Sequence, residues 1–167
     1  MQRIQPNLWF DTEAEEAARF YVDVFGGDSR IGTITRYGPD SPGPEGTVMT
    51  VDFRLQGQWF TGINGGPQFP FTEAVSFVVN CDGQEEIDHF WDRLVEGGEP
   101  GPCGWLKDRY GLSWQVVPTE WYEMYQDPDQ EKVRRVTQAM LATRGKFDLA
   151  ALRAAIEGSG EPATRGT

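Results

Sequence analysis

Two segments of the chain repeat one pattern of apolar and polar positions, and both are predicted to be amphipathic helices. Residues 15–27 read EEAARFYVDVFGG, and residues 85–97 read EEIDHFWDRLVEG. In each copy the apolar side chains fall at positions i, i+3, i+4 and i+7, which form one stripe along a helix. The stripe consists of Ala17, Phe20, Tyr21 and Val24 in the first copy and of Ile87, Phe90, Trp91 and Leu94 in the second. Paired glutamates begin each helix and a glycine follows it, as the helix dipole and the C-terminal turn favour.

Strand-like runs surround both helices in the same order. Strands are predicted at 4–10, 30–37, 47–55 and 58–64 around the first helix and at 74–80, 101–107 and 112–117 around the second. The segment GPDSPGPEG at 38–46 is a Pro/Gly-rich surface loop. Because a repeated supersecondary unit determines the architecture, we predict an α+β fold. It has two tandem βαβββ modules, about 3–66 and 72–118, in one domain at 1–118 with one curled mixed sheet.

The pattern changes after Pro118, where residues 119–157 are predicted to form a helical extension of the same domain. Asp127 and Pro128 are typical of an N-cap and a first helical residue. The apolar face of that helix is Val133, Val136, Met140 and Leu141. A second helix is expected from about Asp148 to a stop at Gly158. We expect these helices to cover a sheet edge or to pack on a partner subunit, and residues 158–167 to be disordered.

Charge and hydropathy exclude two classes of partner. The chain has 167 residues, 26 acidic against 15 basic, and a formal net charge of −11. That field repels a phosphate backbone, so nucleic acid is not expected as a partner. No apolar run reaches the roughly 20 residues that cross a bilayer, and the N-terminus lacks the pattern of a signal peptide. We therefore expect a cytoplasmic protein without a membrane partner, whose two cysteines, Cys81 and Cys103, are free and buried.

Several strings in this order resemble a known family. They are LWFDTEAEEAARFYVDVFGG, TRYG, GTVMTV, NGGPQFPFTEAVSFVVNC and CGWLKDRYGLSWQVVP. Over roughly residues 3–157 the chain is similar to the PhnB-like branch of the vicinal oxygen chelate (glyoxalase/bleomycin-resistance) superfamily. The resemblance implies tandem βαβββ modules curled around a cavity, and a homodimer. Members of this branch often have the label 3-demethylubiquinone-9 3-methyltransferase.

The resemblance also implies where a metal enzyme of this superfamily would place its four ligands, which are His, Gln or Glu. Counted along the repeat, those positions are occupied by Pro6, Thr61, Ser76 and Gln115. Proline has no donor atom, and neutral hydroxyls are weak ligands for divalent transition metals. Gln115 alone is a plausible ligand. We therefore expect no metal and no cofactor.

Other catalytic arrangements have little support in the sequence. The one histidine, His89, lies off the apolar stripe of its helix and is expected to be a solvated surface residue. Nucleophilic catalysis through a Ser-His-Asp or Cys-His arrangement would need this residue. Neither cysteine has a neighbouring base or helix N-terminus that would activate it.

Neutral polar and aromatic groups remain as candidates for a cavity. Ser76, Ser113 and Gln115 share one side of the sheet if Gln115 faces the cavity, opposite Trp114. Trp105 is a candidate for the cavity floor, and Asn64 either contacts a ligand or caps its own turn. The candidate ligand-binding residues are Gln115, Ser76, Ser113, Thr61, Asn64 and Trp105.

Three hypotheses about function follow, and the sequence does not decide whether the chain is an enzyme. The first is a metal-free protein that binds a small, partly apolar molecule. The second is a superfamily enzyme, such as a lyase, isomerase or dioxygenase, that uses an unrecognised metal or base. The third is the methyltransferase of the family label. A Rossmann-type methyltransferase would need a Gly-rich turn that opens a helix, whereas Gly26-Gly27 ends a helix and Gly65-Gly66 ends a strand.

Overall fold

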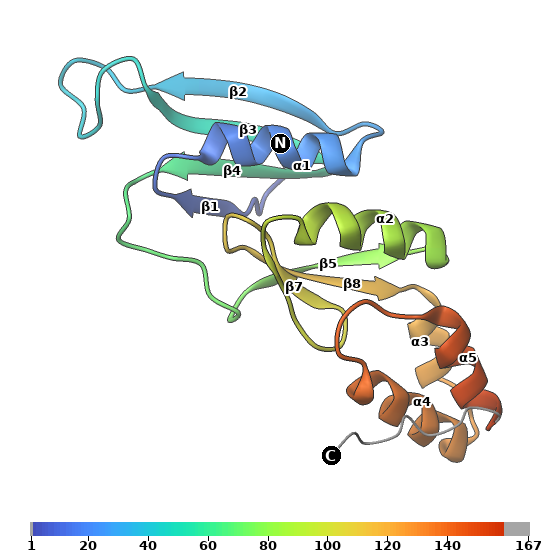
Figure 1. The fold of residues 1–167 in the computed structure, drawn as a ribbon. Coiled ribbons are helices and arrows are strands. Elements are labelled where there is room, and N and C mark those ends of the chain that lie inside the picture. Colours follow the sequence, from blue (N-terminus) through green and yellow to red (C-terminus); the bar gives the residue numbers. More distant parts are fainter. Residues whose placement is uncertain (1, 159–167) are drawn as a thin grey trace. The chain divides into compact units, whose positions relative to one another are not determined.

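The computed structural model describes residues 2–158 and divides the chain into two compact units between Phe71 and Thr72. Each unit has four strands and a helix in the order βαβββ, and the second also contains the helical extension (Figure 1). The α+β class and the repeated module are thereby confirmed. Hydrogen bonds between the described strands form two four-stranded sheets, one in each unit, where the sequence predicted one curled sheet.

The first unit is a mixed sheet with one helix on one face (Figure 1). Its elements are β1 (Asn7–Phe10), α1 (Ala14–Phe25), β2 (Arg30–Arg36), β3 (Val48–Leu55) and β4 (Gln58–Asn64). The strand order is β1-β4-β3-β2, with β1 parallel to β4 and the other neighbours antiparallel.

The core of the first unit lies between α1 and the alternate residues of the strands. Val51, Phe53 and Leu55 are buried at every second position of β3, and the rings of Tyr21 and Phe53 are 6.0 Å apart. The predicted helical stripe is correct at Ala17, Tyr21 and Val24, but Phe20 is only half-buried, and Ala14 and Ala18 are buried instead.

The second unit repeats this topology. Its strands and helix are β5 (Ser76–Cys81), α2 (Gln84–Val95), β6 (Glu99–Pro100), β7 (Trp105–Lys107) and β8 (Ser113–Pro118). The strand order β5-β8-β7-β6 corresponds to that of the first sheet, and β5 is parallel to β8. The predicted apolar stripe of α2 is confirmed, since Ile87, Phe90, Trp91 and Leu94 are its buried residues. The strand predicted at 101–107 is wrong in its first half, because residues 101–104 form the turn between β6 and β7.

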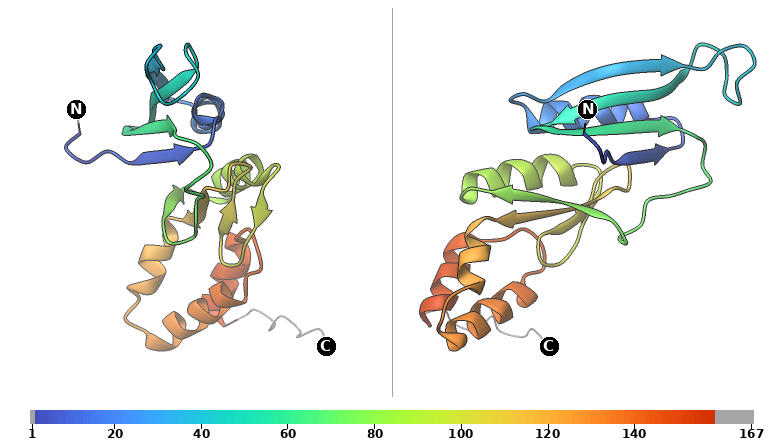
Figure 2. Two further views of the ribbon diagram at one scale, coloured as in Figure 1. Left: turned by 90° about the vertical axis from the view of Figure 1, so that its left-hand side faces the viewer. Right: turned by 180° about the vertical axis from the view of Figure 1, so that it is seen from behind.

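Three helices follow the second sheet (Figure 2): α3 (Glu120–Tyr125), α4 (Gln130–Ala142) and α5 (Leu149–Glu157). The prediction missed α3. It also placed the N-cap of α4 at Asp127, two residues early. The N-cap is Asp129, whose side chain accepts from the Glu131 N–H, while the Asp127 side chain accepts from the Asp129 N–H. The start of α5 at Asp148 and its stop at Gly158 are confirmed.

The apolar face predicted for α4 is only partly correct. Val136 is fully buried, whereas Leu141 is 61% exposed. Val136 packs with Met124, Phe147 and Leu152 in a cluster that all three helices and the α4–α5 connection supply. The tail predicted to be disordered at 158–167 lies outside the described residues from 159 onward. Within the described part of the chain no helix is long and apolar enough to span a membrane.

Candidate functional site

One face of the second sheet brings together four of the predicted site residues. Strand register pairs Ser76 with Ser113 and Trp105 with Gln115, and paired residues of neighbouring strands share a face. Trp114 and Leu106, on the opposite face, are buried on the side that packs against α2. The face opposite α2 therefore presents Ser76, Ser113, Gln115 and Trp105, and the two serines and Gln115 share one side as the sequence predicted.

Gln115 is half-buried on this face and is bonded to a second predicted residue. Its Nε2 donates to Ser76 Oγ at 2.8 Å, between adjacent parallel strands. Gln115 thus follows buried Trp114 and precedes buried Val116 along β8, but its side chain projects from the opposite face of the strand. This explains a polar residue in an otherwise apolar strand.

A cavity of about 450 Å³ opens beside this pair within the second unit. Its lining is Glu73, Glu99, Pro100, Gly101, Pro102, Trp105, Leu106, Lys107 and Ser113. Ser113 is fully buried, and its Oγ is the one buried side-chain oxygen or nitrogen of the described residues without a hydrogen-bond partner. Most buried polar atoms are hydrogen-bonded, so the unpaired Ser113 hydroxyl is an exception beside this cavity.

The charged groups around this cavity do not favour an anionic ligand. Lys107 Nζ forms an ion pair with Glu73 Oε1 at 2.6 Å, and Glu99 faces Lys107 in the strand register. The hydrogen bond from Lys107 lowers the pKa of Glu73, and the hydrogen bond to Glu73 raises the pKa of Lys107. Two carboxylates therefore lie near one ammonium that is already paired, so the cavity offers no free positive charge to an anion.

The other two predicted site residues lie in the first unit and have structural roles there. Thr61 Oγ1 accepts from Gln5 Nε2 and donates to Asp52 Oδ1, both at 2.7 Å. Asn64 Oδ1 accepts from the Ala14 N–H at 2.8 Å. Asn64 therefore caps the start of α1 from a distant strand, and its role as a ligand contact stays a prediction.

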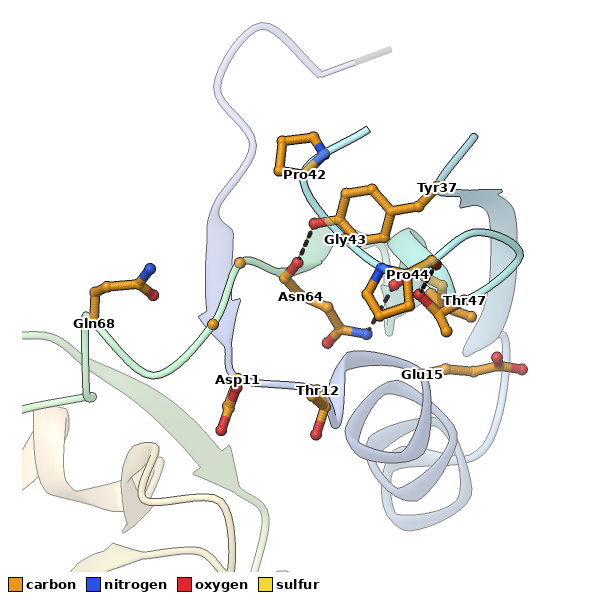
Figure 3. Close-up of a pocket in the computed structure, with 13 residues that line it drawn as sticks. Asp11, Thr12, Glu15, Tyr37, Pro42, Gly43, Pro44, Thr47, Asn64 and Gln68 are labelled. Atoms are coloured by element: carbon orange, nitrogen blue, oxygen red, sulfur yellow. Dashed lines mark hydrogen bonds between the residues drawn. The ribbon is translucent and has the colours of Figure 1, made fainter. Parts of the chain in front are cut away.

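A second cavity, of about 610 Å³, lies in the first unit (Figure 3). The loop at 38–46 forms one wall, and the start of α1 forms another. Its central polar groups are bonded to the backbone: Tyr37 Oη donates to the Asn64 carbonyl at 2.5 Å and Thr47 Oγ1 to the Pro44 carbonyl at 2.6 Å. Because these hydroxyls hold the loop in place, the second cavity is a weaker candidate than the first.

The donors present do not fit a divalent transition metal of the kind the superfamily's enzymes use. Pro6 offers only its backbone carbonyl, which accepts from the Thr61 N–H, and the Thr61, Ser76 and Gln115 side chains are hydrogen-bonded as described above. Within residues 2–158 no group of three or more His, Cys, Asp or Glu is placed to hold a metal ion. His89 lies exposed on α2 beside the Phe90 ring, as the sequence predicted.

The sequence reasoning missed one buried charge near the cavity, Asp108. This residue is 3% exposed and follows β7. Its carboxylate accepts from the Tyr110 and Leu112 N–H groups and, at 2.8 Å, from Trp114 Nε1. An aspartate at the start of a turn that ends in glycine was the available signal. Asp108 fixes the β7–β8 turn and so the register of Lys107 with Ser113.

The family model for 3-demethylubiquinone-9 3-methyltransferase matches residues 2–117. The chain belongs to this family. The match ends within β8, so α3, α4 and α5 lie outside it. No match was found among curated proteins.

Solved structures agree with the family. A putative 3-demethylubiquinone-9 3-methyltransferase, PhnB protein, from Bacillus cereus is 39% identical over 71% of this chain and 100% of its own, with a TM-score of 0.64. A protein from Pseudomonas aeruginosa is 25% identical over 71% of this chain and 98% of its own, with a TM-score of 0.57. The fosfomycin resistance protein FosX from Listeria monocytogenes is 15% identical over 71% and 93%, with a TM-score of 0.48. The family model and the Bacillus cereus structure confirm the predicted PhnB-like family.

Proposed function

We propose that this PhnB-like protein binds a small, neutral, partly apolar molecule in the cavity beside β7 and β8, without a divalent transition metal. The observation that supports it most is the Ser113 hydroxyl, which is fully buried in the cavity wall and has no partner in the protein. The volume of about 450 Å³ is within the range of small-molecule sites.

The lining suggests how such a ligand is held. Trp105 and the prolines at 100 and 102 offer flat apolar surface, on which an aromatic or alicyclic group packs. The Ser113 hydroxyl offers one donor and two acceptor positions. Gln115 lies on the same face, next to Trp105 in the strand register, which supports a contact with the part of a ligand that extends beyond the cavity.

Methyl transfer, which the family name describes, has no support from the topology. Gly26 and Gly27 follow α1, and Gly65 and Gly66 follow β4. Neither pair opens a helix, whereas a dinucleotide-type fold binds its cofactor at a Gly-rich turn before a helix. Calorimetry with S-adenosylmethionine at about millimolar concentration tests the name directly, and we expect no heat of binding.

Ligand binding is tested with a neutral solvatochromic dye, Nile red, and matched tryptophan variants. We expect Nile red to bind wild-type protein and Trp105→Phe to weaken binding about threefold or more, because the ring forms the cavity wall. The control is Trp59→Phe, since Trp59 lies in β4 of the first unit. Equal affinity of the Trp105→Phe variant and wild type would refute the cavity as the binding site.

Metal independence is tested by elemental analysis of protein purified without chelator. We expect no stoichiometric Zn, Mn, Fe, Co or Ni, because one amide oxygen and two hydroxyls are a poor ligand set. A transition metal at about one equivalent would favour the alternative of a superfamily enzyme. The homodimer and the cytoplasmic location expected from the sequence stay predictions.

A further inference from the structure

The turn between β6 and β7 borders the proposed ligand cavity. Gly101, Pro102 and Trp105 all belong to the cavity lining. Two residues between them have positive φ angles, 55° at Cys103 and 76° at Gly104. A non-glycine residue adopts this left-handed conformation at a cost, so the shape of the turn depends on support from its surroundings.

That support comes from the connection between α4 and α5, residues 143–148, which is hereafter the clasp segment. The Cys103 N–H donates to the Thr143 carbonyl, and the Gly104 N–H donates to the Gly145 carbonyl, both at 3.0 Å. The Phe147 ring lies against Gly104 so closely that a Cβ added there would be 2.6 Å from it. The turn thus has the ligand cavity on one side and the clasp segment on the other.

The clasp segment is itself fixed to the second unit by contacts that do not involve the turn. Gln84 of α2 donates through Nε2 to the Phe147 carbonyl at 3.1 Å and accepts through Oε1 from the Leu149 N–H at 2.9 Å. Lys146 Nζ lies 2.8 Å from Asp88 and 3.1 Å from Asp92. Phe147 is 2% exposed within the cluster of the three C-terminal helices.

We infer that the clasp segment positions the β6–β7 turn and so sets the affinity of the cavity for its ligand. Phe147 and Gln84 are positioning residues for this site, because they act on Gly101, Pro102 and Trp105 through the turn. The clasp segment lies outside the region that matches the family, residues 2–117. Affinity control through this segment is therefore an addition to the family's common core. The inference rests on the proposed ligand binding.

The thiol of Cys103 offers a readout of the clasp that needs no ligand. Cys103 is partly exposed, and its Sγ donates to the Met140 carbonyl at 3.3 Å. The second cysteine, Cys81, is fully buried, and burial raises its pKa to about 12. Ellman's reagent therefore reacts first at Cys103, at a rate that follows the local opening of the turn and the clasp segment.

The experiment compares Phe147→Leu with Ile156→Val. Both trim a residue of the same cluster, but Ile156 is not among the groups nearest Gly104. We expect Phe147→Leu to speed the labelling of Cys103 about tenfold and to weaken Nile red binding about threefold. Ile156→Val is expected to leave both within about a factor of two. Gln84→Ala, which removes one side-chain bond to the clasp segment at Phe147 and one to Leu149 at the start of α5, is the second variant and should act in the same direction.

The possible failures are distinguishable. If Cys103 is labelled at the wild-type rate in folded Phe147→Leu and Gln84→Ala variants, the clasp segment does not hold the β6–β7 turn. Faster labelling with unchanged Nile red affinity would refute the link from the clasp to the cavity. If Trp105→Phe does not change Nile red binding, the proposed function is refuted, and so is control of the affinity by the clasp segment. The labelling rates of Cys103 still decide whether the clasp segment holds the β6–β7 turn. Circular dichroism establishes that each variant is folded.

Discussion

The buried carboxylate of Asp108 accepts a hydrogen bond from the indole N–H of Trp114, six residues further along the chain, at 2.8 Å. The same carboxylate accepts from two backbone N–H groups of the intervening turn. These bonds connect the end of β7 to β8, the two strands that position Trp105, Lys107 and Ser113 in the cavity wall.

Asp108→Asn should destabilise the protein although the shape of the side chain is retained. An amide has one acceptor oxygen, so its NH₂ group must face either the indole N–H or a backbone N–H. We expect a loss of about 2 to 3 kcal/mol in the free energy of unfolding, measured by urea titration. Asp40→Asn, at an exposed position of the 38–46 loop, is the control and should change little. Equal midpoints for both variants would show that the buried bonds contribute no net stability.

Ser76→Ala should lower the stability of the protein, whereas Ser113→Ala should not. Ser113 Oγ is buried without a partner, so its removal relieves the desolvation of an unpaired hydroxyl. We expect the free energy of unfolding to stay equal or to rise by about 1 kcal/mol. Ser76 Oγ accepts from Gln115, so Ser76→Ala should lose about 1 kcal/mol. Thermal unfolding without ligand measures both. Marked destabilisation by Ser113→Ala would mean that its hydroxyl is already satisfied, and would weaken the proposed ligand contact.

The parts of the fold that could be predicted were those encoded by local periodicity and by the repeat. The stripe of α2 was correct because four apolar residues at helical spacing define one face without knowledge of the partner sheet. The duplication then gave the same strand order twice. Strand alternation was also enough to place Ser113 and Gln115 on one face, opposite Trp114.

The parts that could not be predicted depend on partners distant in the sequence. Asn64 caps a helix that begins 50 residues earlier, and no local pattern distinguishes such a cap from a ligand contact. The turn at 101–104 was assigned to a strand because its support, the Thr143 and Gly145 carbonyls, comes from 40 residues later. The α4 cap was misplaced because Asp127 and Asp129 are both good capping residues, and the choice depends on backbone geometry.

Gln115→Glu tests the assignment of the metal-ligand positions. The change adds the carboxylate that a metal enzyme of this superfamily would carry there, but leaves Pro6, Thr61 and Ser76 in place. One carboxylate with weak hydroxyl donors does not form a tight site, so we expect calorimetry to show less than about a tenfold change in zinc affinity. A tight stoichiometric zinc site in this single variant would overturn the assignment of the four positions.

The stability of the second unit should fall at alkaline pH because of Cys81. This thiol is fully buried in β5. Burial, and then the charges of Glu86 and Asp82, raise its pKa from 9.0 to about 12. The unfolded chain therefore loses the thiol proton above about pH 9 while the folded chain retains it, and deprotonation favours unfolding. The contribution of the neutral thiol is fully present below pH 9 and is lost as the pH rises toward 12, by at most about 1.4 kcal/mol per pH unit.

Cys81→Ala removes this titration and so isolates it from the other groups that ionise at alkaline pH. The variant should be less stable than wild type at about pH 8, because it leaves a small cavity in the core. The difference in the free energy of unfolding should narrow as the pH is raised to about 10.5, since only the wild type pays for keeping the thiol protonated. Urea titrations of both proteins at several pH values measure this difference in the free energy of unfolding. Parallel curves for the two proteins would show that Cys81 does not retain its proton in the folded state.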